Sequence, residues 1–284
     1  MRVPAPPRRR DGLVQAVSRT LAILDELACY PAGGTPKALA AELGLTVGTV
    51  YRLLNTLVAR GYVVRDPDTR LFFLGPHLPL LNAALLQSLH VPPRLRQCVE
   101  ALHRATGESA SLVQWWGDEV IASALVEGTA PDSIRGGYVG IIAPAHRIAS
   151  GKVLLAWAPL ARVDSYLTTS HLDPFEHLPP VDPGNVRSEL AAIRRVGYAL
   201  DRESLGWGVG CVAAPVFSPD GRVRYALGLT LAAARFQAEE PALVETVLGI
   251  ARAATSALQT DQAARSARPP GRRAGKEPLL PRPG

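Results

Sequence analysis

Residues 38–63 contain two short amphipathic segments broken by "LGLT" at residues 43–46, and this break constrains the fold more than any other feature of the chain. Thr35 can cap a helix that begins at Pro36. Proline suits this first position, because the amide hydrogen that it lacks would have no partner there. Gly44 supplies the left-handed residue that ends this helix. Thr46 can then cap a second helix. The pattern predicts two helices joined by a tight corner.

The helix after Thr46 has an apolar and a polar face at helical spacing. Its predicted buried side chains are Val50, Leu53, Leu54, Leu57 and Val58. Its predicted outward-facing residues are Gly48, Thr49, Arg52, Asn55, Thr56 and Ala59.

Two neighbouring segments complete a small domain. Residues 13–28 predict an earlier helix whose buried stripe is Val17, Leu21, Leu24 and Ala28. Two strand-like runs flank the turn sequence "DPDT" at residues 66–69. Three helices followed by a hairpin predict a winged helix-turn-helix.

The polar face of the second helix has the side chains that read DNA in a major groove. Arg52 is suited to guanine and Asn55 to adenine, because each can make two parallel hydrogen bonds to that base. Arginines beside the wing turn and on the helix at residues 13–28 are expected to meet phosphates. The predicted DNA-binding residues are Arg19, Thr46, Thr49, Arg52, Asn55, Thr56, Arg65 and Arg70. A winged helix used only for protein contact is the alternative.

The formal net charge of +6 does not by itself indicate nucleic-acid binding. Residues 1–11 hold four Arg and one Asp, and residues 261–284 hold six basic and two acidic residues. The segment between these tails has a net charge of −1. Both tails are rich in Pro, Arg, Gly and Ala, so we expect them to be disordered and to add non-specific attraction to phosphate.

Several other classes of protein are disfavoured by what the sequence contains. No run of eighteen apolar residues is present, and the first residues lack the apolar segment of a secretion signal, so we expect a cytoplasmic protein. Three widely spaced cysteines predict reduced thiols, and no spacing matches a zinc motif, His171, Asp173 and His177 included. We expect no metal and no cofactor.

An enzyme remains as a weaker alternative. Cys211 could act as a nucleophile, with His146 as its base and Asp201 orienting the imidazole. The sequence has no "GxSxG" elbow, and Lys152 in "SGKVLL" is followed by valine, not by the Ser or Thr of a phosphate-binding loop. We therefore expect no catalysis.

The second half of the chain mixes helical and strand-like segments. A helix at residues 79–90 is expected to link the two halves. Further helices are predicted at residues 93–105, 147–157, 160–168, 183–196 and 239–259. A hairpin turns at "PDG", residues 219–221. Helices flanking an antiparallel sheet predict an α+β ligand-sensing domain.

Five segments together resemble the IclR family of transcriptional regulators, in family order from about residue 13 to 258. They are "SRTLAILDELA", "LAAELGLTVGTVYRLLNTLVARGYV", "FFLGPHL", "HRIASGKVLLAWAP" and "ELAAIRRVGYALDRESLGWGVGCVAAPVFSPDGRVRYALGL". The resemblance implies a C-terminal GAF-like domain that binds a small effector, assembly into a homodimer or homotetramer, and repression or activation at an operator.

The resemblance also implies a set of effector-binding residues. Carried onto this chain, they are Gly140, Asp201, Val209, Cys211, Gly228 and Thr230. Gly228 departs from the serine that is frequent at its place. This difference removes one hydrogen bond to a small carboxylate and disfavours a glyoxylate-like effector. An organic acid and an aromatic metabolite are the candidate effectors.

The predicted fold class is α+β, with an N-terminal winged helix-turn-helix joined by a linker helix to a GAF-like α/β effector-binding domain. The predicted boundaries are a basic tail at 1–11, the DNA-binding domain at 12–75, the linker helix at 76–91, the effector domain at 92–259 and a second tail at 260–284. The expected partners are a double-stranded DNA operator, a small effector and further copies of the chain, with no membrane.

Overall fold

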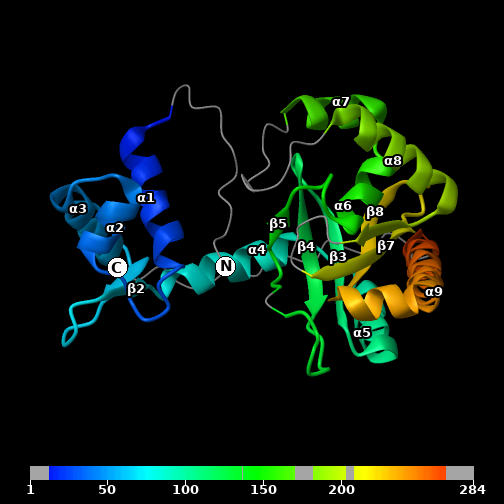
Figure 1. Ribbon diagram of the computed structural model, residues 1–284, viewed down its shortest axis with the longest axis horizontal. Helices are drawn as coiled ribbons and strands as arrows, with labels where there is room; N and C mark the ends of the chain where they lie inside the picture. The colour runs from blue at the N-terminus through cyan, green and yellow to red at the C-terminus, as the bar shows by residue number, and fades with distance from the viewer. Residues whose placement is uncertain (1–12, 136, 170–181, 203–207, 267–284) are drawn as a thin grey trace.

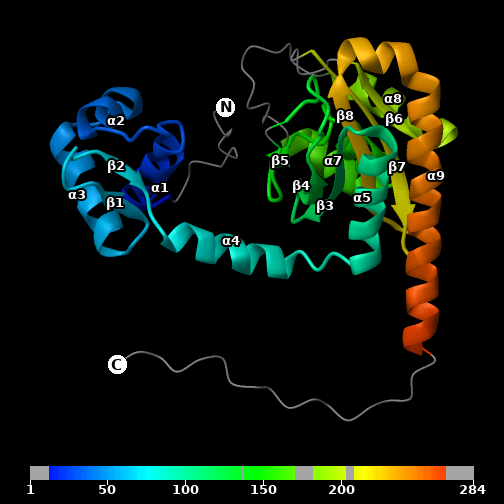
Figure 2. The same cartoon turned by 90° about the horizontal axis from the view of Figure 1, so that it is seen from below.

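The computed structural model describes residues 13–135, 137–169, 182–202 and 208–266. Two bodies are joined by one long helix, α4 (His77–Ser88), which is seen end to end in Figure 2. The N-terminal body is a small helical unit, and the C-terminal body is built around a sheet (Figure 1).

The N-terminal body is a winged helix-turn-helix. Its elements are α1 (Gln15–Leu27), α2 (Pro36–Leu43), α3 (Val47–Ala59), β1 (Val63–Arg65) and β2 (Phe72–Leu74), the two strands pairing antiparallel. The Thr35 hydroxyl accepts a hydrogen bond from the Ala38 amide at 3.1 Å, and Gly44 has a φ of +62°. The Thr46 hydroxyl accepts one from the Thr49 amide at 3.3 Å. The predicted caps and corner are confirmed.

The buried stripe predicted for residues 13–28, the region of α1, is wrong. The structure buries Ile23 and Leu27, whereas Val17 is 55% exposed and Leu21 46% exposed. Leu24 is only half-buried and Ala28 is exposed. The core of this body is formed by α1, α2, α3 and the hairpin, and it takes its α1 residues from the C-terminal half of that helix, so the apolar residues nearer its start stay outside. On α3, Val58 was also expected inside and is exposed.

The linker helix α4 packs against neither body along most of its length. None of its residues is buried, and Leu80 and Leu81 are 64% and 49% exposed. Its two ends are anchored: the His77 amide donates to the Gly61 carbonyl and the His77 ring packs against Tyr62 of the first body, and Leu89 is buried at the second body. An apolar helix left open to water is a surface that a partner can cover.

The C-terminal body contains a six-stranded antiparallel sheet in the order β5-β4-β3-β8-β7-β6. The strands are β3 (Ser109–Trp116), β4 (Glu119–Val126), β5 (Ile142–Ala143), β6 (Ala199–Arg202), β7 (Val209–Phe217) and β8 (Val223–Ala232). This antiparallel sheet with flanking helices confirms the α+β class.

Helices cover both faces of the sheet, and each face has its own core. On one face α5 (Pro93–Thr106) and α9 (Ala233–Ser266) bury Leu112, Val212 and Leu229 (Figure 1). On the other face α6 (Ala149–Ala156) and α8 (Pro183–Val196) bury Val113, Ala213 and Ala226, with α7 (Leu160–Thr169) beside them. Residues that alternate along a strand therefore belong to different cores.

The last helix is longer at both ends than residues 239–259. It begins at Ala233, directly after β8, and runs to Ser266. Residues 260–266 were expected in a disordered tail and are helical in the structure. The Arg94 guanidinium on α5 pairs with the Asp261 carboxylate at 3.0 Å, which holds this extension against the neighbouring helix.

Candidate nucleic-acid interface and effector site

The outward face of α3 lies open to solvent. Thr46, Arg52, Asn55 and Thr56 are exposed, and Thr49 is half-buried. Three of these five side chains are engaged locally: the Thr46 and Thr49 hydroxyls lie 2.9 Å apart, and the Thr56 hydroxyl donates to the Arg52 carbonyl. Arg52 and Asn55 make no side-chain hydrogen bond within the described residues. These two side chains are therefore free to reach base edges.

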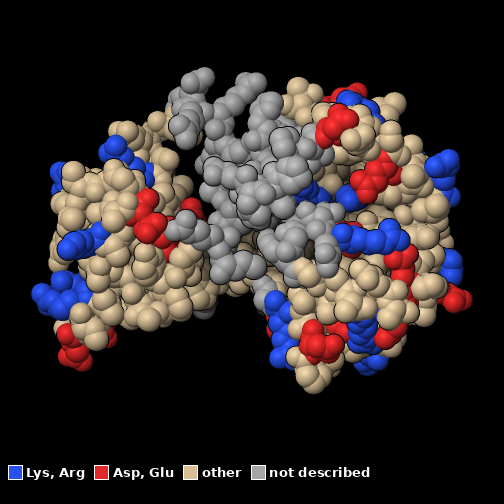
Figure 3. All heavy atoms as spheres, viewed as in Figure 1, with Lys and Arg blue, Asp and Glu red and all other residues tan. Residues whose placement is uncertain are grey.

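The wing turn is organised by Asp66. Its carboxylate accepts hydrogen bonds from the Asp68 amide at 3.1 Å and from the Thr69 amide and hydroxyl, both at 2.7 Å. The bonds from Thr69 lower the pKa of Asp66 below its usual value. Arg70 follows with a φ of +63° and is exposed. Figure 3 shows basic and acidic side chains next to each other at the end of the wing.

The other two predicted phosphate contacts differ from Arg70. Arg19 is half-buried on α1, and Arg65 is half-buried on β1. The Arg65 guanidinium lies over the rings of Tyr51 and Phe72. It is held in place, whereas Arg70 projects from the turn.

In the C-terminal body, three of the predicted effector residues form one row across neighbouring strands. Asp201 on β6 pairs with Cys211 on β7, and Cys211 pairs with Thr230 on β8. The Cys211 sulfur and the Thr230 hydroxyl lie 3.5 Å apart, and Asp201 is buried. Val209 is two residues before Cys211 on the same strand face. The register thus brings four of the six predicted residues together.

Cys211 is a neutral thiol at physiological pH. Burial raises its pKa to about 12, an effect that the hydrogen bond from Thr230 only partly opposes. An activated cysteine nucleophile needs a lowered pKa. The environment of Cys211 is therefore that of a binding or packing residue.

Gly228 lies beneath the first turn of α6. A Cβ built on Gly228 would be 2.7 Å from Ser150 Oγ, so the glycine allows the helix to approach β8 closely. Gly151 allows a different close approach, between α6 and the loop that precedes it, because its Cβ would come 2.4 Å from the Ala145 backbone. The difference from the family's serine at position 228 has a packing consequence, which the sequence did not reveal.

The structure does not bring Gly140 to this row. Gly140 lies two residues before β5, at the edge of the sheet opposite to β6 and Asp201. Its φ is +101°, and a Cβ on it would be 3.6 Å from Leu85 Cδ2 of the linker helix. Its position indicates a contact between the β4–β5 connection and α4.

Sequence reasoning did not predict that the polar side chains around the start of α6 are buried. His146, Arg147, Ser150 and Lys152 are all buried. The Lys152 ammonium pairs with the Glu189 carboxylate of α8 at 2.8 Å, and His146 Nδ1 is 2.9 Å from the Tyr166 hydroxyl. The density of polar residues in "HRIASGK" was the available signal.

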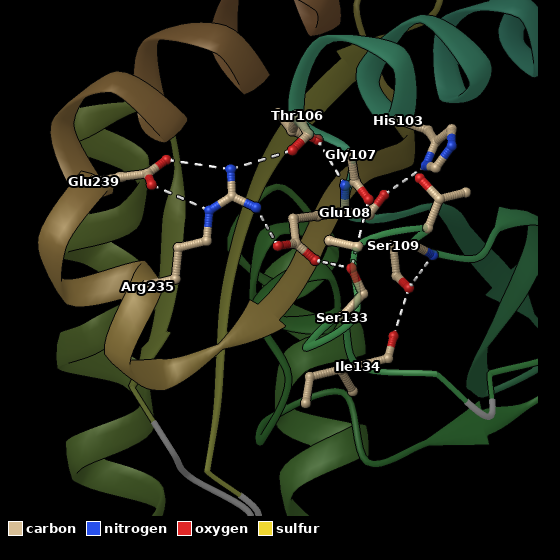
Figure 4. Close-up of polar contacts among 12 residues, drawn as sticks. His103, Thr106, Gly107, Glu108, Ser109, Ser133, Ile134, Arg235 and Glu239 are labelled. Atoms are coloured by element: carbon tan, nitrogen blue, oxygen red, sulfur yellow. Dashed lines mark hydrogen bonds and ion pairs between the residues drawn. The ribbon is translucent and has the colours of Figure 1, made fainter.

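A second polar network, on the other face of the sheet, was also missed (Figure 4). Glu108 is 1% exposed, and its carboxylate accepts hydrogen bonds from Arg235 of α9 and from the Ser133 hydroxyl at 2.8 Å. Arg235 also bonds Glu239 and the Thr106 carbonyl. The bonds to Glu239 and then to Glu108 raise the pKa of the Arg235 guanidinium. This network ties α5, α9 and the β4–β5 connection together.

The described residues contain neither a group of metal-binding side chains nor a helix suited to span a membrane. Within the described residues no group of three His, Cys, Asp or Glu side chains could hold a metal ion, and His171, Asp173 and His177 lie outside those residues. In the same part of the chain, no helix combines the length and the apolar character that a bilayer span requires.

The capped helix-turn-helix, its free polar face and its wing define a DNA-binding protein that carries a second, α+β domain. Comparison with known families agrees: residues 16–67 match the IclR helix-turn-helix domain, and residues 83–257 match the bacterial transcriptional regulator IclR C-terminal domain. The chain belongs to the IclR family of bacterial transcriptional regulators.

Individual relatives resemble the chain along most of its length. It is 31% identical over 258 residues to the DNA-binding transcriptional repressor YiaJ of Escherichia coli, covering 89% of this chain and 91% of that one. An IclR transcriptional regulator from Alicyclobacillus acidocaldarius is 25% identical, with a TM-score of 0.62, over 87% and 98% of the two chains. An IclR homologue from Microbacterium hydrocarbonoxydans in complex with 4-hydroxybenzoate shares the fold at 22% identity, with a TM-score of 0.63, over 87% and 100%.

Proposed function

We propose that this regulator binds a double-stranded operator as a homodimer, through the outward face of α3, and that a small effector bound in the C-terminal domain controls this binding. The observation that carries the proposal is the exposed pair Arg52 and Asn55, which no other described residue engages. Such side chains on a helix that fits the major groove are positioned to read bases. We further propose that the protein acts in the cytoplasm.

The homodimer is supported by apolar surface that the chain itself leaves uncovered. Exposed aliphatic side chains lie along α1 and at its start, and along α4. They are Leu13, Val14, Val17, Leu21, Leu80 and Leu81. A second copy that covers these helices would bury them and would pair two α3 helices. Reading helices separated by about 34 Å would then enter successive major grooves. Pairs of such dimers would make the tetramer.

For the effector we propose a site between the row of Asp201, Cys211 and Thr230 and the first turn of α6. Ser150 is 8% exposed, and its hydroxyl makes no hydrogen bond within the described residues. The first turn of α6 has no side-chain cap, so its amides are open to an acceptor. Arg147 and Lys152 add buried positive charge.

This chemistry favours a small organic acid as the effector, because a carboxylate is stabilised at a helix N-terminus and by nearby cations. The homologue that binds 4-hydroxybenzoate supports an aromatic acid as the first compound to test. The neutral thiol of Cys211 supports binding without turnover.

Effector binding must favour one arrangement of the linker helices over another to act on DNA. Two contacts support a route for this coupling. The Gln114 side-chain amide on β3 donates to the Leu89 carbonyl at the end of α4 at 3.0 Å, and Gly140 lies beside Leu85. His90 then has a φ of +45°, so the chain turns sharply between α4 and α5.

Selection of bound sequences from random 30-base-pair duplexes, followed by footprinting of the DNA beside the gene, tests the DNA-binding part of the proposal. We expect one protected palindromic operator. A chain that protects no DNA and enriches no sequence would instead support a protein-interaction module. Calorimetric titration with 4-hydroxybenzoate and other small acids tests the effector site, and prolonged incubation with analysis of the ligand tests for turnover.

A further inference from the structure

Arg65 occupies an unusual environment at the junction of the wing and the reading helix. It lies opposite Phe72 in the β1–β2 pairing. Its guanidinium carbon is 5.5 Å from the centre of the Tyr51 ring on α3 and 5.3 Å from the centre of the Phe72 ring on β2. The two rings meet edge to face, with centres 6.1 Å apart. Arg65 therefore joins α3 to the wing by cation–π contact.

The guanidinium has no acceptor within the described residues. Its Nε is buried without a hydrogen-bond partner, and no ion pair or side-chain hydrogen bond of Arg65 is present there. The neighbouring carboxylate of Asp66 is occupied by Asp68 and Thr69. The terminal nitrogens of the guanidinium are not among the buried unpartnered atoms, so they are the part of this cation that an anion external to the domain can reach.

We propose that Arg65 binds a phosphate of the DNA backbone in a preset orientation, and that Tyr51 is a positioning residue for it. The proposal rests on the proposed function, because it requires DNA at the outward face of α3. A phosphate beside this face would accept two hydrogen bonds from the terminal nitrogens of the guanidinium, which are not among the buried unpartnered atoms, and would pair with its charge. The stacked rings fix the plane of the guanidinium before DNA arrives.

Arg65 should consequently tolerate lysine less well than an exposed arginine outside the interface does. A guanidinium stacks on aromatic rings and forms a fork, whereas a lysine ammonium does neither in the same way. Arg252 is exposed on α9 of the C-terminal body and has no ring contact within the described residues, so a lysine there retains what the residue offers, a positive charge. Arg252 is the matched control.

The experiment measures the Kd of the full chain for its selected 30-base-pair duplex across a series of salt concentrations. For Arg65→Ala we expect the slope of log K against log salt to shrink by about 0.9, the value of one lost phosphate contact. For Arg65→Lys we expect about tenfold weaker binding at one salt concentration, because the stacked guanidinium is lost while the positive charge is retained. Arg252→Lys should bind like wild type.

Substitutions of Tyr51 separate a positioning role from a merely structural one. Tyr51→Phe retains the ring and should bind like wild type, whereas Tyr51→Leu should weaken binding and make Arg65→Lys nearly silent in its background. Thermal unfolding of each variant identifies those that fold, and Arg65→Lys carries the test if Arg65→Ala does not.

An unchanged salt slope in folded Arg65→Ala, or wild-type affinity in Arg65→Lys, would overturn the assignment. If wild-type protein binds no selected duplex at all, the proposed function fails, and this outcome is distinct from the failure of Arg65.

Discussion

The backbone of Gly228 lies directly under the hydroxyl of Ser150, so that a Cβ on the glycine would come 2.7 Å from Ser150 Oγ. The next atoms that this Cβ would meet are at 3.5 Å and 3.6 Å, which is ordinary contact. One hydroxyl therefore decides whether position 228 can carry a side chain. The same hydroxyl lies at the proposed effector site.

Gly228→Ala should lower the free energy of unfolding by about 1–3 kcal/mol, because the added methyl overpacks the contact between β8 and α6. Combining it with Ser150→Ala should restore much of that loss, since the clashing atom is then absent. Urea unfolding of both single variants and the double variant measures the coupling. Strict additivity of the two single effects would show that the close approach does not limit position 228.

Arg52→Ala should weaken operator binding by about 1–3 kcal/mol and leave thermal stability unchanged, because the side chain is exposed and makes no described contact. A mobility-shift titration at fixed salt measures the change. Arg252→Ala, an exposed arginine on α9 in the C-terminal body, is the charge-matched control. Equal binding by Arg52→Ala and wild type would remove this residue from the interface.

Asp201→Ala and Cys211→Ser should change effector affinity without abolishing DNA binding, since both positions lie in the sheet of the C-terminal domain. Titration calorimetry with an effector identified by screening measures the affinity, and a mobility shift without effector checks the DNA-binding domain. The proposed site is wrong if both variants bind the effector as tightly as wild type does.

Stability should fall with rising pH in a manner that depends on Cys211. The folded pKa is about 12 against an ordinary value of 9.0, so the folded state holds its proton more tightly than the unfolded chain does. The contribution to stability is therefore complete below pH 9 and is lost as pH rises from 9 toward 12.

Urea unfolding between pH 7 and 10.5 tests this dependence. The stability difference between wild type and Cys211→Ala should stay constant up to about pH 9 and then shrink. Because Cys98 and Tyr225 also have raised pKa values, only the difference between the two proteins isolates Cys211. A difference that does not vary with pH would contradict the prediction.

Arg235→Met should destabilise the C-terminal body by about 3 kcal/mol, because it leaves the buried Glu108 carboxylate without its cation. Arg202→Met is the matched control: it removes an ion pair with Glu240, but Arg202 is exposed, so the change should be below about 1 kcal/mol. Thermal or urea unfolding compares the two. Similar losses in both variants would show that burial of Glu108 does not govern the effect.

The sequence by itself determined the local features of this protein. Thr35, Pro36, Gly44 and Thr46 act within one helical turn of themselves, so their caps and corner could be predicted from spacing alone. The "PDG" turn, the wing and the polar face of α3 follow from equally short-range rules, and the family resemblance pointed to Asp201, Cys211 and Thr230, which lie in one row.

Tertiary structure decided whatever depends on residues that are distant along the chain. Which side of α1 is buried depends on where α2 and α3 pack, and the apolar pattern alone pointed to Val17 and Leu21. Glu108 pairs with Arg235, which is 127 residues further along the chain. The position of Ser150 over Gly228 depends on how α6 packs against the sheet. The contact between Arg65 and the Tyr51 ring depends on how the hairpin packs against α3. Such contacts depend on close packing between elements, which no local pattern of residues records.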